Sequence, residues 1–247
     1  MQTTSPFYPH CMEVLSNLRY FRIPHDQLDI MLQGFRRETW EKGVRIEIDT
    51  LERFVVVTRG RIELIRTDYS SGRDLTIFLL HPGDAFDVIT LLDGEPHDLT
   101  PIALDQVDLL SIPLDSAREW LRTHPEFNQQ FLPYLGHQMR ALENLATDLA
   151  FHDTVTRLGR LLTQHLLPNQ QPLTKTSQSF ELLNNLTHET LARMIGSVRV
   201  VVSRHIQHWK HNGTVSTGRK HLTIRNLQGL LNGCDKIEAS ILKKNTP

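Results

Sequence analysis

Residues 186–213 carry a pattern of helix caps, apolar spacing and glycine that constrains the fold more tightly than any other stretch of the chain. Thr187 is placed to cap a helix, and Gly196 ends that helix in a sharp turn. The apolar residues of this helix recur at helical spacing: Leu191, Met194 and Ile195. A second helix follows at once and ends at Asn212-Gly213. Two short helices joined by a tight turn predict a helix-turn-helix motif.

The second helix has two chemically different faces. One face is apolar and is expected to pack against the first helix: Val198, Val201, Val202 and Ile206. The other face is expected to point outward: Arg199, Val200, Ser203, Arg204 and Gln207. Guanidinium groups suit guanine edges or phosphates, and a valine suits a thymine methyl group. This face therefore predicts a recognition helix that enters the major groove of double-stranded DNA.

A basic hairpin follows the second helix, with residues 216–220 at its tip, and makes the motif a winged helix-turn-helix. From Thr187 to the last residue there are ten Lys and Arg against three Asp and Glu, which leaves 17 against 25 in residues 1–186. A basic end on an acidic body favours a local contact with a polyanion. The alternative is an ordinary two-helix packing corner whose arginines are only solvated.

The composition is that of a globular chain long enough for two domains, with 247 residues, 39% hydrophobic and 22% charged. No apolar run approaches the ~20 residues of a membrane span, and the first residues lack the pattern of a signal peptide, so we expect a cytoplasmic protein without a membrane partner. Cys11 and Cys234 lie near opposite ends without metal-ligand spacing. They are expected to be free thiols, and no metal site is predicted.

Residues before about 40 have helical spacing, in two segments around residues 12–18 and 28–35. From Thr39 the chain changes to short β-rich runs separated by glycines, which is typical of an antiparallel barrel or roll. Ser71-Gly72 is expected to form a hairpin turn. The predicted strands are residues 45–48, 54–58, 61–66, 75–80, 99–104 and 109–113.

A long helical region is predicted from His124 to about residue 151. Heptads place a mainly apolar seam along it, which indicates a coiled-coil helix of a homodimer. The alternative is a helix packed along its own β-roll, and Pro133 should kink or restart the helix in either case. The seam begins at Asn128, and the residues expected in the dimer interface are Phe131, Leu135, Gln138, Leu142, Leu145 and Leu149.

Residues 151–153 are a hinge candidate before a further helix at 154–167, and residues 168–179 are predicted to be a loop. The expected fold is α+β: a double-stranded β-roll over residues 1–123, a dimerisation helix over 124–151 and a winged helix-turn-helix domain over 152–247. The loop is a candidate contact for RNA polymerase, with a flexible linker as the alternative.

In this order, the elements resemble the Crp–Fnr superfamily of bacterial transcription regulators over nearly the whole chain. The resemblance rests on three local sequences besides the helix-turn-helix: Arg59-Gly60-Arg61-Ile62-Glu63-Leu64 at a glycine turn, Pro82-Gly83-Asp84-Ala85-Phe86 at a second turn, and Leu149–Leu158 at the hinge. It implies a cyclic-nucleotide-binding-like roll, allosteric control, a homodimer on palindromic DNA and no catalytic activity.

The recognition helix is similar to that of cyanobacterial nitrogen-control regulators of the NtcA type, because Val200 stands where other branches of the superfamily carry a glutamate. By this resemblance some residues should read bases or adjacent phosphates: Arg199, Val200, Ser203 and Arg204. Thr187 and Ser197 should hold phosphate by the same resemblance. The predicted DNA-binding set also includes His188, Gln207 and, at the basic hairpin, Arg219 and Lys220.

The resemblance also places an effector cradle, formed by Phe86, Asp87, Val88, Ile89, Thr90 and Leu91 with Gln138 and Glu143 on the long helix. Cyclic-nucleotide binders of the superfamily use an Arg-Ser pair for the phosphate, and Asp98-Leu99 stands there in this chain. The nitrogen-control regulators use arginines for 2-oxoglutarate, and Gln138 replaces the helix arginine. Cyclic AMP is therefore not expected, the effector is unknown and no cofactor is predicted.

Several rival interpretations remain open at the level of sequence. A roll of this kind can be a metal dioxygenase, but the region offers only His81 and His97, without a His-x-His motif. Haem sensing, with axial ligands among His10, Cys11, His81 and His97, and 2-oxoglutarate sensing are alternatives for the effector. A protein-interaction module without DNA specificity is the alternative for the C-terminal domain. The histidines at 205, 208 and 211 are expected near DNA phosphates or water rather than on a metal.

Overall fold

The computed structural model describes residues 34–46, 52–125, 128–164, 178–179, 186–218 and 221–231. The chain divides into two compact units, Met1–Glu143 and Asn144–Pro247. The predicted helix at 12–18 and residues 28–33 of the predicted helix at 28–35 lie outside the described residues, and residues 34 and 35 are not helical.

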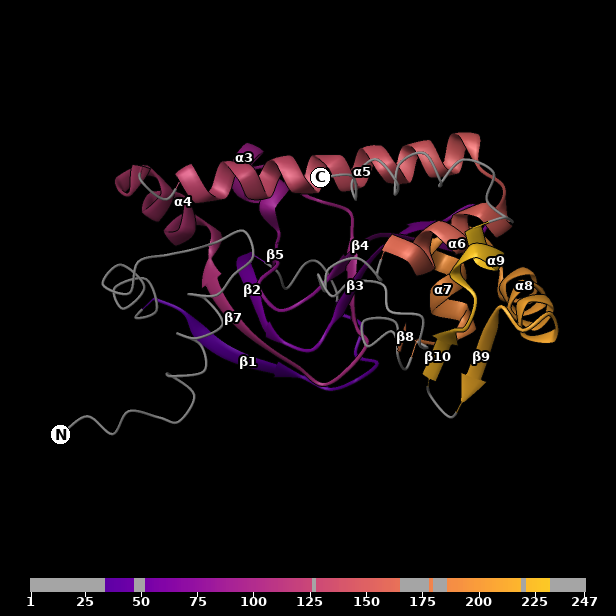
Figure 1. The fold of residues 1–247 in the computed structure, drawn as a ribbon. Helices are drawn as coiled ribbons and strands as arrows, with labels where there is room; N and C mark the ends of the chain where they lie inside the picture. The colour runs from indigo at the N-terminus through magenta and orange to yellow at the C-terminus, as the bar shows by residue number, and fades with distance from the viewer. Residues whose placement is uncertain are drawn as a thin grey trace, which may run out of the picture. The chain divides into compact units, whose positions relative to one another are not determined.

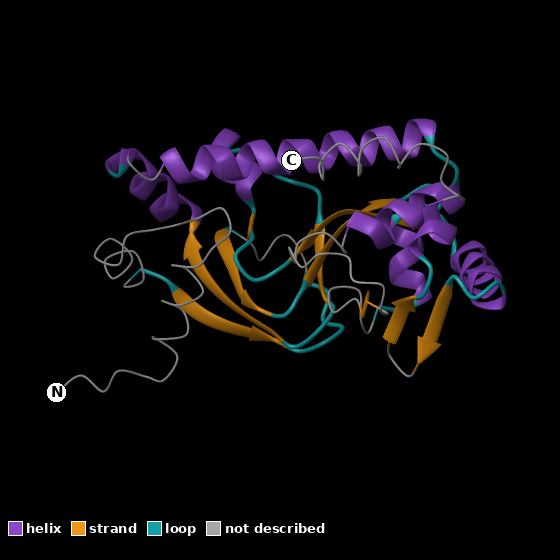
Figure 2. Ribbon diagram, viewed as in Figure 1, coloured by secondary structure: helices purple, strands orange, loops and turns teal. Residues whose placement is uncertain are grey.

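The N-terminal unit is built on two antiparallel sheets (Figures 1 and 2). The four-stranded sheet has the order β1-β7-β2-β5 and the three-stranded sheet the order β4-β3-β6. Their bounds are β1 Arg36–Trp40, β2 Arg53–Arg59, β3 Ile62–Asp68, β4 Arg73–Leu80, β5 Ala85–Phe86, β6 Thr100–Ala103 and β7 Val107–Pro113. The predicted β-roll is confirmed.

Strand β2 shows why this sequence forms a roll with two layers of core. Its run Phe54 to Val57 is apolar at every position, and all four side chains are buried. Val55 and Val57 belong to the core shared with β3, while Phe54 and Val56 belong to the core on the opposite face. Because successive strand residues point to opposite faces, a continuous apolar run requires cover on both faces of its sheet.

The turn between β2 and β3 depends on Gly60. Its φ is +81°, and a Cβ atom on this residue would lie 2.4 Å from the carbonyl oxygen of Gln106. Only glycine fits both the backbone conformation and the close approach. The next residue, Arg61, is buried and bonds Asp105 through Nε at 2.6 Å and Nη2 at 2.9 Å, so the turn is fixed on both sides.

Most predicted strands match the structure to within two residues, and Ser71-Gly72 lies in the turn between β3 and β4 as expected. Two expectations were wrong. The strand region begins at Arg36 rather than Thr39, because residues 36–40 pair antiparallel with β7. The strand predicted at 45–48 is reduced in its described part to an isolated bridge between Arg45 and Ile102.

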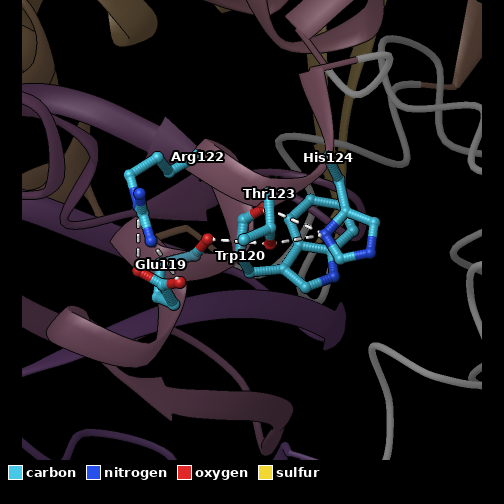
Figure 3. Close-up of polar contacts among 5 residues, drawn as sticks. All are labelled: Glu119, Trp120, Arg122, Thr123 and His124. Carbon is cyan, nitrogen blue, oxygen red and sulfur yellow. Dashed lines mark hydrogen bonds and ion pairs between the residues drawn. The ribbon is translucent and has the colours of Figure 1, made fainter.

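Two helices that were not predicted cover this unit, α3 (Val88–Asp93) and α4 (Leu114–Thr123). In Figure 3 the end of α4 is closed by its own side chains: the hydroxyl of Thr123 lies 2.9 Å from the carbonyl oxygen of Glu119, and the His124 ring stacks on Trp120 with 4.8 Å between centroids. Residue 124 therefore ends α4 rather than opening the next helix, as the sequence had suggested.

Helix α5 (Asn128–Phe151) is continuous through Pro133, so the expected restart does not occur. Pro133 is the sixth residue of the helix, just beyond the first turn, so it removes one hydrogen bond of the second turn without ending the helix. Figure 1 shows α3, α4 and the first half of α5 on one side of the strands of this unit. Phe131 and Tyr134 contribute to the core on that side.

The C-terminal unit contains helices α6 (Thr154–Gln164), α7 (His188–Met194), α8 (Arg199–His211) and α9 (Leu227–Leu231). A small sheet of order β8-β10-β9 is formed by Gln178–Ser179, His221–Ile224 and Val215–Gly218. The predicted loop is thus corrected at residues 178–179, which form β8, while residues 168–177 lie outside the described part. The predicted helix-turn-helix with a wing is confirmed.

No helix among the described residues is both long enough and apolar enough to cross a lipid bilayer.

Candidate nucleic-acid interface and ligand cavity

Helix α7 begins and ends where the sequence indicated. The hydroxyl of Thr187 accepts a hydrogen bond from the backbone N–H of Thr190 at 3.1 Å, which satisfies one of the amides that a helix start leaves unpaired. After the helix, Gly196 adopts a φ of +59° and the backbone N–H of Ser197 donates to the carbonyl of Ala192 at 2.8 Å. This compact turn sends the chain directly into α8.

Helix α8 buries one face and exposes the other. Val202, Ile206 and Trp209 are buried, whereas Val200 is 76% exposed. The charged and polar residues of the outward face are also accessible: Arg199, Arg204 and Gln207. The prediction was wrong for Val198, which caps the helix and is 45% exposed rather than packed.

The two helices are joined by a side-chain contact close to this face. Nδ1 of His188 lies 2.8 Å from the hydroxyl of Ser203. Burial lowers the pKa of His188, and the charge of Arg199 lowers it further, so the ring is predominantly neutral at pH 7. His188 therefore orients Ser203 on α8, and Ser203 is only partly accessible.

The histidines at 205, 208 and 211 do not share one environment. Nε2 of His205 lies 3.1 Å from the hydroxyl of Thr154 on α6, and burial lowers the pKa of this histidine. His205 is therefore a contact between helices, while His208 and His211 are exposed, and their position near DNA phosphates or water stays a prediction. Across the described ranges no group of three His, Cys, Asp or Glu residues could hold a metal ion.

Helix α6 braces the helix-turn-helix. The Asp153 carboxylate accepts from the N–H of Thr156 at 2.8 Å at the start of α6, and Nη1 of Arg157 donates to the carbonyl of Ile195 at 2.7 Å. At the end of α5, Asp148 accepts from Nε of Arg160 at 2.6 Å. The predicted hinge at 151–153 is thus a corner with ion-paired and hydrogen-bonded contacts on both sides.

The wing is a hairpin in which His221 pairs with Gly218. The predicted phosphate contacts at its tip, Arg219 and Lys220, lie outside the described residues. Their role stays a prediction.

The N-terminal unit contains a cavity of about 220 Å³ between its sheets, α3 and α5. The cavity is lined by Leu64, Phe78, Leu80, Ala85, Phe86, Asp87, Val88, Ile89, Leu92, His97, Leu99, Leu135, Gln138, Met139 and Leu142. Five of the eight predicted cradle residues are therefore in the lining: Phe86, Asp87, Val88, Ile89 and Gln138.

The other three predicted cradle residues have different environments. Leu91 is 3% exposed and packs in the core, and the carbonyl oxygen of Thr90 accepts from Nη2 of Arg118 at 2.6 Å. Glu143 is exposed and does not line the cavity. Asp98 is exposed and outside the lining as well, while its neighbour His97 takes part in it.

Asp87 has a structural role that the sequence reasoning missed. Its carboxylate lies 3.5 Å from the N–H of Thr90, which it caps at the start of α3, and 3.2 Å from Nδ1 of His97. Gly94 closes α3 in the left-handed conformation. An N-cap aspartate followed seven residues later by glycine is a helix signal that was available in the sequence.

Tyr134 joins α5 to β5 at the edge of the cavity. Its hydroxyl donates to the carbonyl of Ala85 at 2.9 Å and accepts from the N–H of Ala85 at 2.8 Å and from Nε2 of Gln138 at 2.6 Å. Burial raises the pKa of Tyr134, and the Asp84 charge raises it further, so the hydroxyl keeps its proton. One cavity residue, Gln138, is thereby held in place.

The face of α5 that remains available for a partner differs from the predicted seam. Phe131 is 2% exposed in the core of its own unit, so it is removed from the set of interface residues. Leu132 and Met139 are 62% and 70% exposed, and Leu149 is 36% exposed. Leu135, Gln138, Leu142 and Leu145 are half-buried.

Comparison with protein families gives two matches. Residues 156–232 match the family model of the Crp-like helix-turn-helix domain, and residues 45–124 match the cyclic nucleotide-binding domain. The first match contains α7, α8 and the wing. The second ends immediately after α4, so it leaves out the α5 residues that line the cavity.

Sequence relatives include regulators of two kinds. A CRP-like cAMP-activated global transcriptional regulator of Mycobacterium tuberculosis is 25% identical over 179 residues, which are 72% of this chain and 78% of the relative. A global nitrogen regulator of Synechocystis sp. is 27% identical over 193 residues, 76% of this chain and 84% of the relative.

Two solved structures share the fold. A CooA variant from Carboxydothermus hydrogenoformans superposes with a TM-score of 0.68 at 20% identity, covering 82% of this chain and 88% of that one. The regulator CLP of Xanthomonas campestris gives a TM-score of 0.66 at 15% identity, covering 81% and 99%.

Proposed function

Because the chain belongs to the Crp–Fnr superfamily of transcription regulators, with its DNA-binding helix-turn-helix, we propose that it acts without catalysis as a homodimer on palindromic DNA. The observation that carries the proposal is the outward face of α8. Arg199, Val200 and Arg204 are exposed there, while Val202 and Ile206 fix the helix to the domain. An exposed, rigidly held helix face with two guanidinium groups has the chemistry that reads base edges in a major groove.

In this proposal, some residues contact bases and others contact phosphates. Arg204 reads a guanine edge, and Val200 contacts a thymine methyl group. Arg199, at the first turn of α8, and Thr187 and Ser197 at the helix starts contact phosphates and fix the register of the helix in the groove. His188 positions Ser203 rather than contacting DNA through the nitrogen bonded to it.

The dimer forms through α5 in a register shifted from the predicted one. The apolar residues that the roll leaves accessible follow one another at alternating intervals of three and four: Leu132, Leu135, Met139, Leu142, Ala146 and Leu149. This is the spacing of a coiled-coil seam, and a second copy of the same helix is its natural partner. Two-fold symmetry then places two recognition helices about one DNA turn, ~34 Å, apart.

The cavity is the effector site in this proposal, and cyclic AMP is not the effector. A buried phosphodiester needs a cation, but the described residues of the lining contain neither lysine nor arginine and include the carboxylate of Asp87. Met139 and Leu142 belong both to the cavity lining and to the proposed seam. A ligand that repacks these two side chains would therefore bias the arrangement of the dimer helices.

The DNA-binding proposal is tested with Arg204→Ala on a palindrome selected by the wild-type protein from random DNA. Loss of a bidentate guanine contact should weaken specific binding about tenfold or more and relax the sequence preference at that position. Lys210→Ala, which removes the same charge from an exposed position near the end of α8, should weaken all sequences alike. Retention of the full sequence preference by Arg204→Ala contradicts the assignment of Arg204 as a base reader, whereas affinity that is insensitive to salt contradicts DNA binding and favours a protein-interaction module.

The dimer is tested with Leu132→Glu, because Leu132 is exposed in the chain and lies outside the cavity lining. Sedimentation should show a shift from dimer to monomer. Asn144→Glu introduces the same charge on an exposed position of α5 away from the seam and should leave the dimer intact. A dimer that survives Leu132→Glu would refute this seam.

A further inference from the structure

The cavity in the N-terminal unit has a polarity that selects one class of ligand. Twelve of its fifteen lining residues are apolar, and the three polar side chains are Asp87, His97 and Gln138. A site of this kind obtains affinity from apolar contact and selectivity from its few polar groups. The hydrogen-bond roles of these three groups therefore determine what can bind.

All three polar side chains present acceptors to a ligand. The Asp87 carboxylate only accepts. It lies 3.2 Å from Nδ1 of His97, which is the distance of a hydrogen bond from Nδ1–H to the carboxylate, and in this tautomer Nε2 is an acceptor. Gln138 donates one N–H of Nε2 to Tyr134 at 2.6 Å, and its carbonyl oxygen remains an acceptor beside the second N–H. A ligand that carries a donor can therefore bond to any of the three groups.

The charge of the cavity lining also favours a ligand that carries a donor and no negative charge. Asp87 is 8% exposed, and it is the only Asp, Glu, Lys or Arg among the described residues of the lining. An anion placed beside a half-enclosed carboxylate gains no compensating cation and is repelled. A neutral or cationic donor gains a hydrogen bond to a charged acceptor, which is among the stronger kinds.

Size limits the ligand as well. The volume of about 220 Å³ exceeds the ~150 Å³ of an apolar protein cavity known to take up benzene, so a single ring or a fused pair of rings fits. The rim is apolar and accessible, since Ile89, Leu92 and Met139 are 40%, 54% and 70% exposed. These side chains can close over an apolar ligand.

We propose that this cavity binds a compact, mostly apolar molecule that carries an N–H or O–H donor and no negative charge, and that this donor bonds to the Asp87–His97 pair. The proposal rests on the proposed function, because it names the effector class of the same regulator. It excludes both cyclic nucleotides and dicarboxylates from the site.

The test is calorimetric titration of the full-length protein, without DNA, using matched probes. Indole has the required shape and one N–H donor. Benzofuran has the same shape with an oxygen in place of that donor, and indole-2-carboxylate adds a negative charge. We expect saturable indole binding tighter than about 1 mM, about fivefold to tenfold weaker binding of benzofuran, and still weaker binding of indole-2-carboxylate, cyclic AMP and 2-oxoglutarate.

Asp87→Asn removes the negative charge but keeps the helix cap, because asparagine is an equally good cap and keeps α3 in place. This variant should lose most of the discrimination against indole-2-carboxylate, about tenfold. Asp98→Asn makes the same change at the exposed neighbour outside the cavity and should leave the discrimination unchanged. His97→Phe removes one of these acceptors and should reduce the preference for indole over benzofuran, while the Asp87 carboxylate remains an acceptor.

Three results would overturn the inference: no saturable binding of indole, equal affinity of wild-type protein for indole and benzofuran, or tighter binding of any anion. Each can occur while Arg204→Ala still weakens specific DNA binding and relaxes its sequence preference. Failure of the ligand class is therefore distinguishable from failure of the proposed function.

Discussion

Replacing Tyr134 by phenylalanine tests how α5 is attached to the roll beside the cavity. The substitution removes one oxygen atom and no apolar volume. The hydroxyl of Tyr134 bonds both backbone groups of Ala85, and the tyrosine is 0% exposed. Phenylalanine would leave a buried N–H, a buried carbonyl and the amide of Gln138 without this partner. At about 1–3 kcal/mol for each buried group left unsatisfied, with partial relaxation of Gln138 toward the cavity, the free energy of unfolding should fall by roughly 2–4 kcal/mol.

Hydrogen exchange measured by mass spectrometry is the suitable assay, because it reports on the N-terminal unit separately from the rest of the chain. The amides of β2 and β7 should exchange roughly 30-fold to 1,000-fold faster in Tyr134→Phe, since every 1.4 kcal/mol is a factor of ten. Amides of α8 should keep their wild-type rates.

Tyr69→Phe is the matched control, because Tyr69 is 81% exposed and its loss of a hydroxyl should change stability by less than about 0.5 kcal/mol. If protection of β2 and β7 in Tyr134→Phe stays within about threefold of wild type, the bonds to Ala85 do not stabilise the unit as argued.

Three further substitutions test a helix cap, a glycine turn and a hydrogen-bonded aspartate. Thr187→Ala removes the cap of α7 and should reduce the free energy of unfolding by about 1 kcal/mol in urea titrations, whereas Thr187→Ser should restore it. Gly60→Ala should lower the melting temperature much more than Gly72→Ala, because both glycines have positive φ but only at Gly60 does an added Cβ meet a backbone atom. Hydrogen bonds from Thr156 lower the pKa of Asp153, so its contribution to stability is present above the unfolded-state pKa and is lost as pH falls through the folded-state pKa. In urea titrations from pH 5 to 3, about the range in which Asp titrates, the wild type should lose stability more steeply than Asp153→Asn, and parallel curves would count against this role.

The helix-turn-helix could be predicted from the sequence because its determinants are local. A cap at Thr187, helical spacing of apolar residues and a glycine at 196 specify two helices and a turn within thirty residues. The same reasoning assigned Val198 to the packed face and was wrong there. A residue at the N-cap precedes the first helical turn, so the period of the helix does not determine its orientation.

The sequence predicted a β-roll but not the strand at the edge of its four-stranded sheet. Strand β1 exists because residues 36–40 pair with β7, about 70 residues away in the chain, and its own sequence, Arg-Arg-Glu-Thr-Trp, has little strand character. Non-local pairing of this kind leaves no local signal. In contrast, α3 carried a signal that was overlooked, since Asp87 and Gly94 mark its two ends.

The heptad pattern of α5 fits two registers, and packing on the roll decides which of them remains accessible to a partner helix. A seam based on Phe131, Gln138 and Leu145 and one based on Leu132, Met139 and Ala146 are both present in the sequence. The roll buries Phe131 and Tyr134, so the first register is occupied within the chain and only the second remains for another copy. Periodicity alone could not choose, because the choice depends on which face of α5 the sheet covers.

The same covering of α5 explains why the cavity and the seam share residues. Phe131 and Tyr134 pack α5 onto the roll. Residues four or eight positions after either of them lie beside this packed face, at its border with the accessible face of the helix. Leu135, Gln138, Met139 and Leu142 are at this border and line the cavity. A ligand there contacts side chains that a partner helix would also contact, so we expect ligand binding to alter dimer affinity, and linkage then requires that dimerisation alter ligand affinity by the same factor. Coupling between effector and dimer then needs no long pathway through the protein, because the two sites meet on one helical face. Measuring dimer dissociation with and without indole would show this coupling directly, and equal dissociation constants would mean that Met139 and Leu142 do not transmit it.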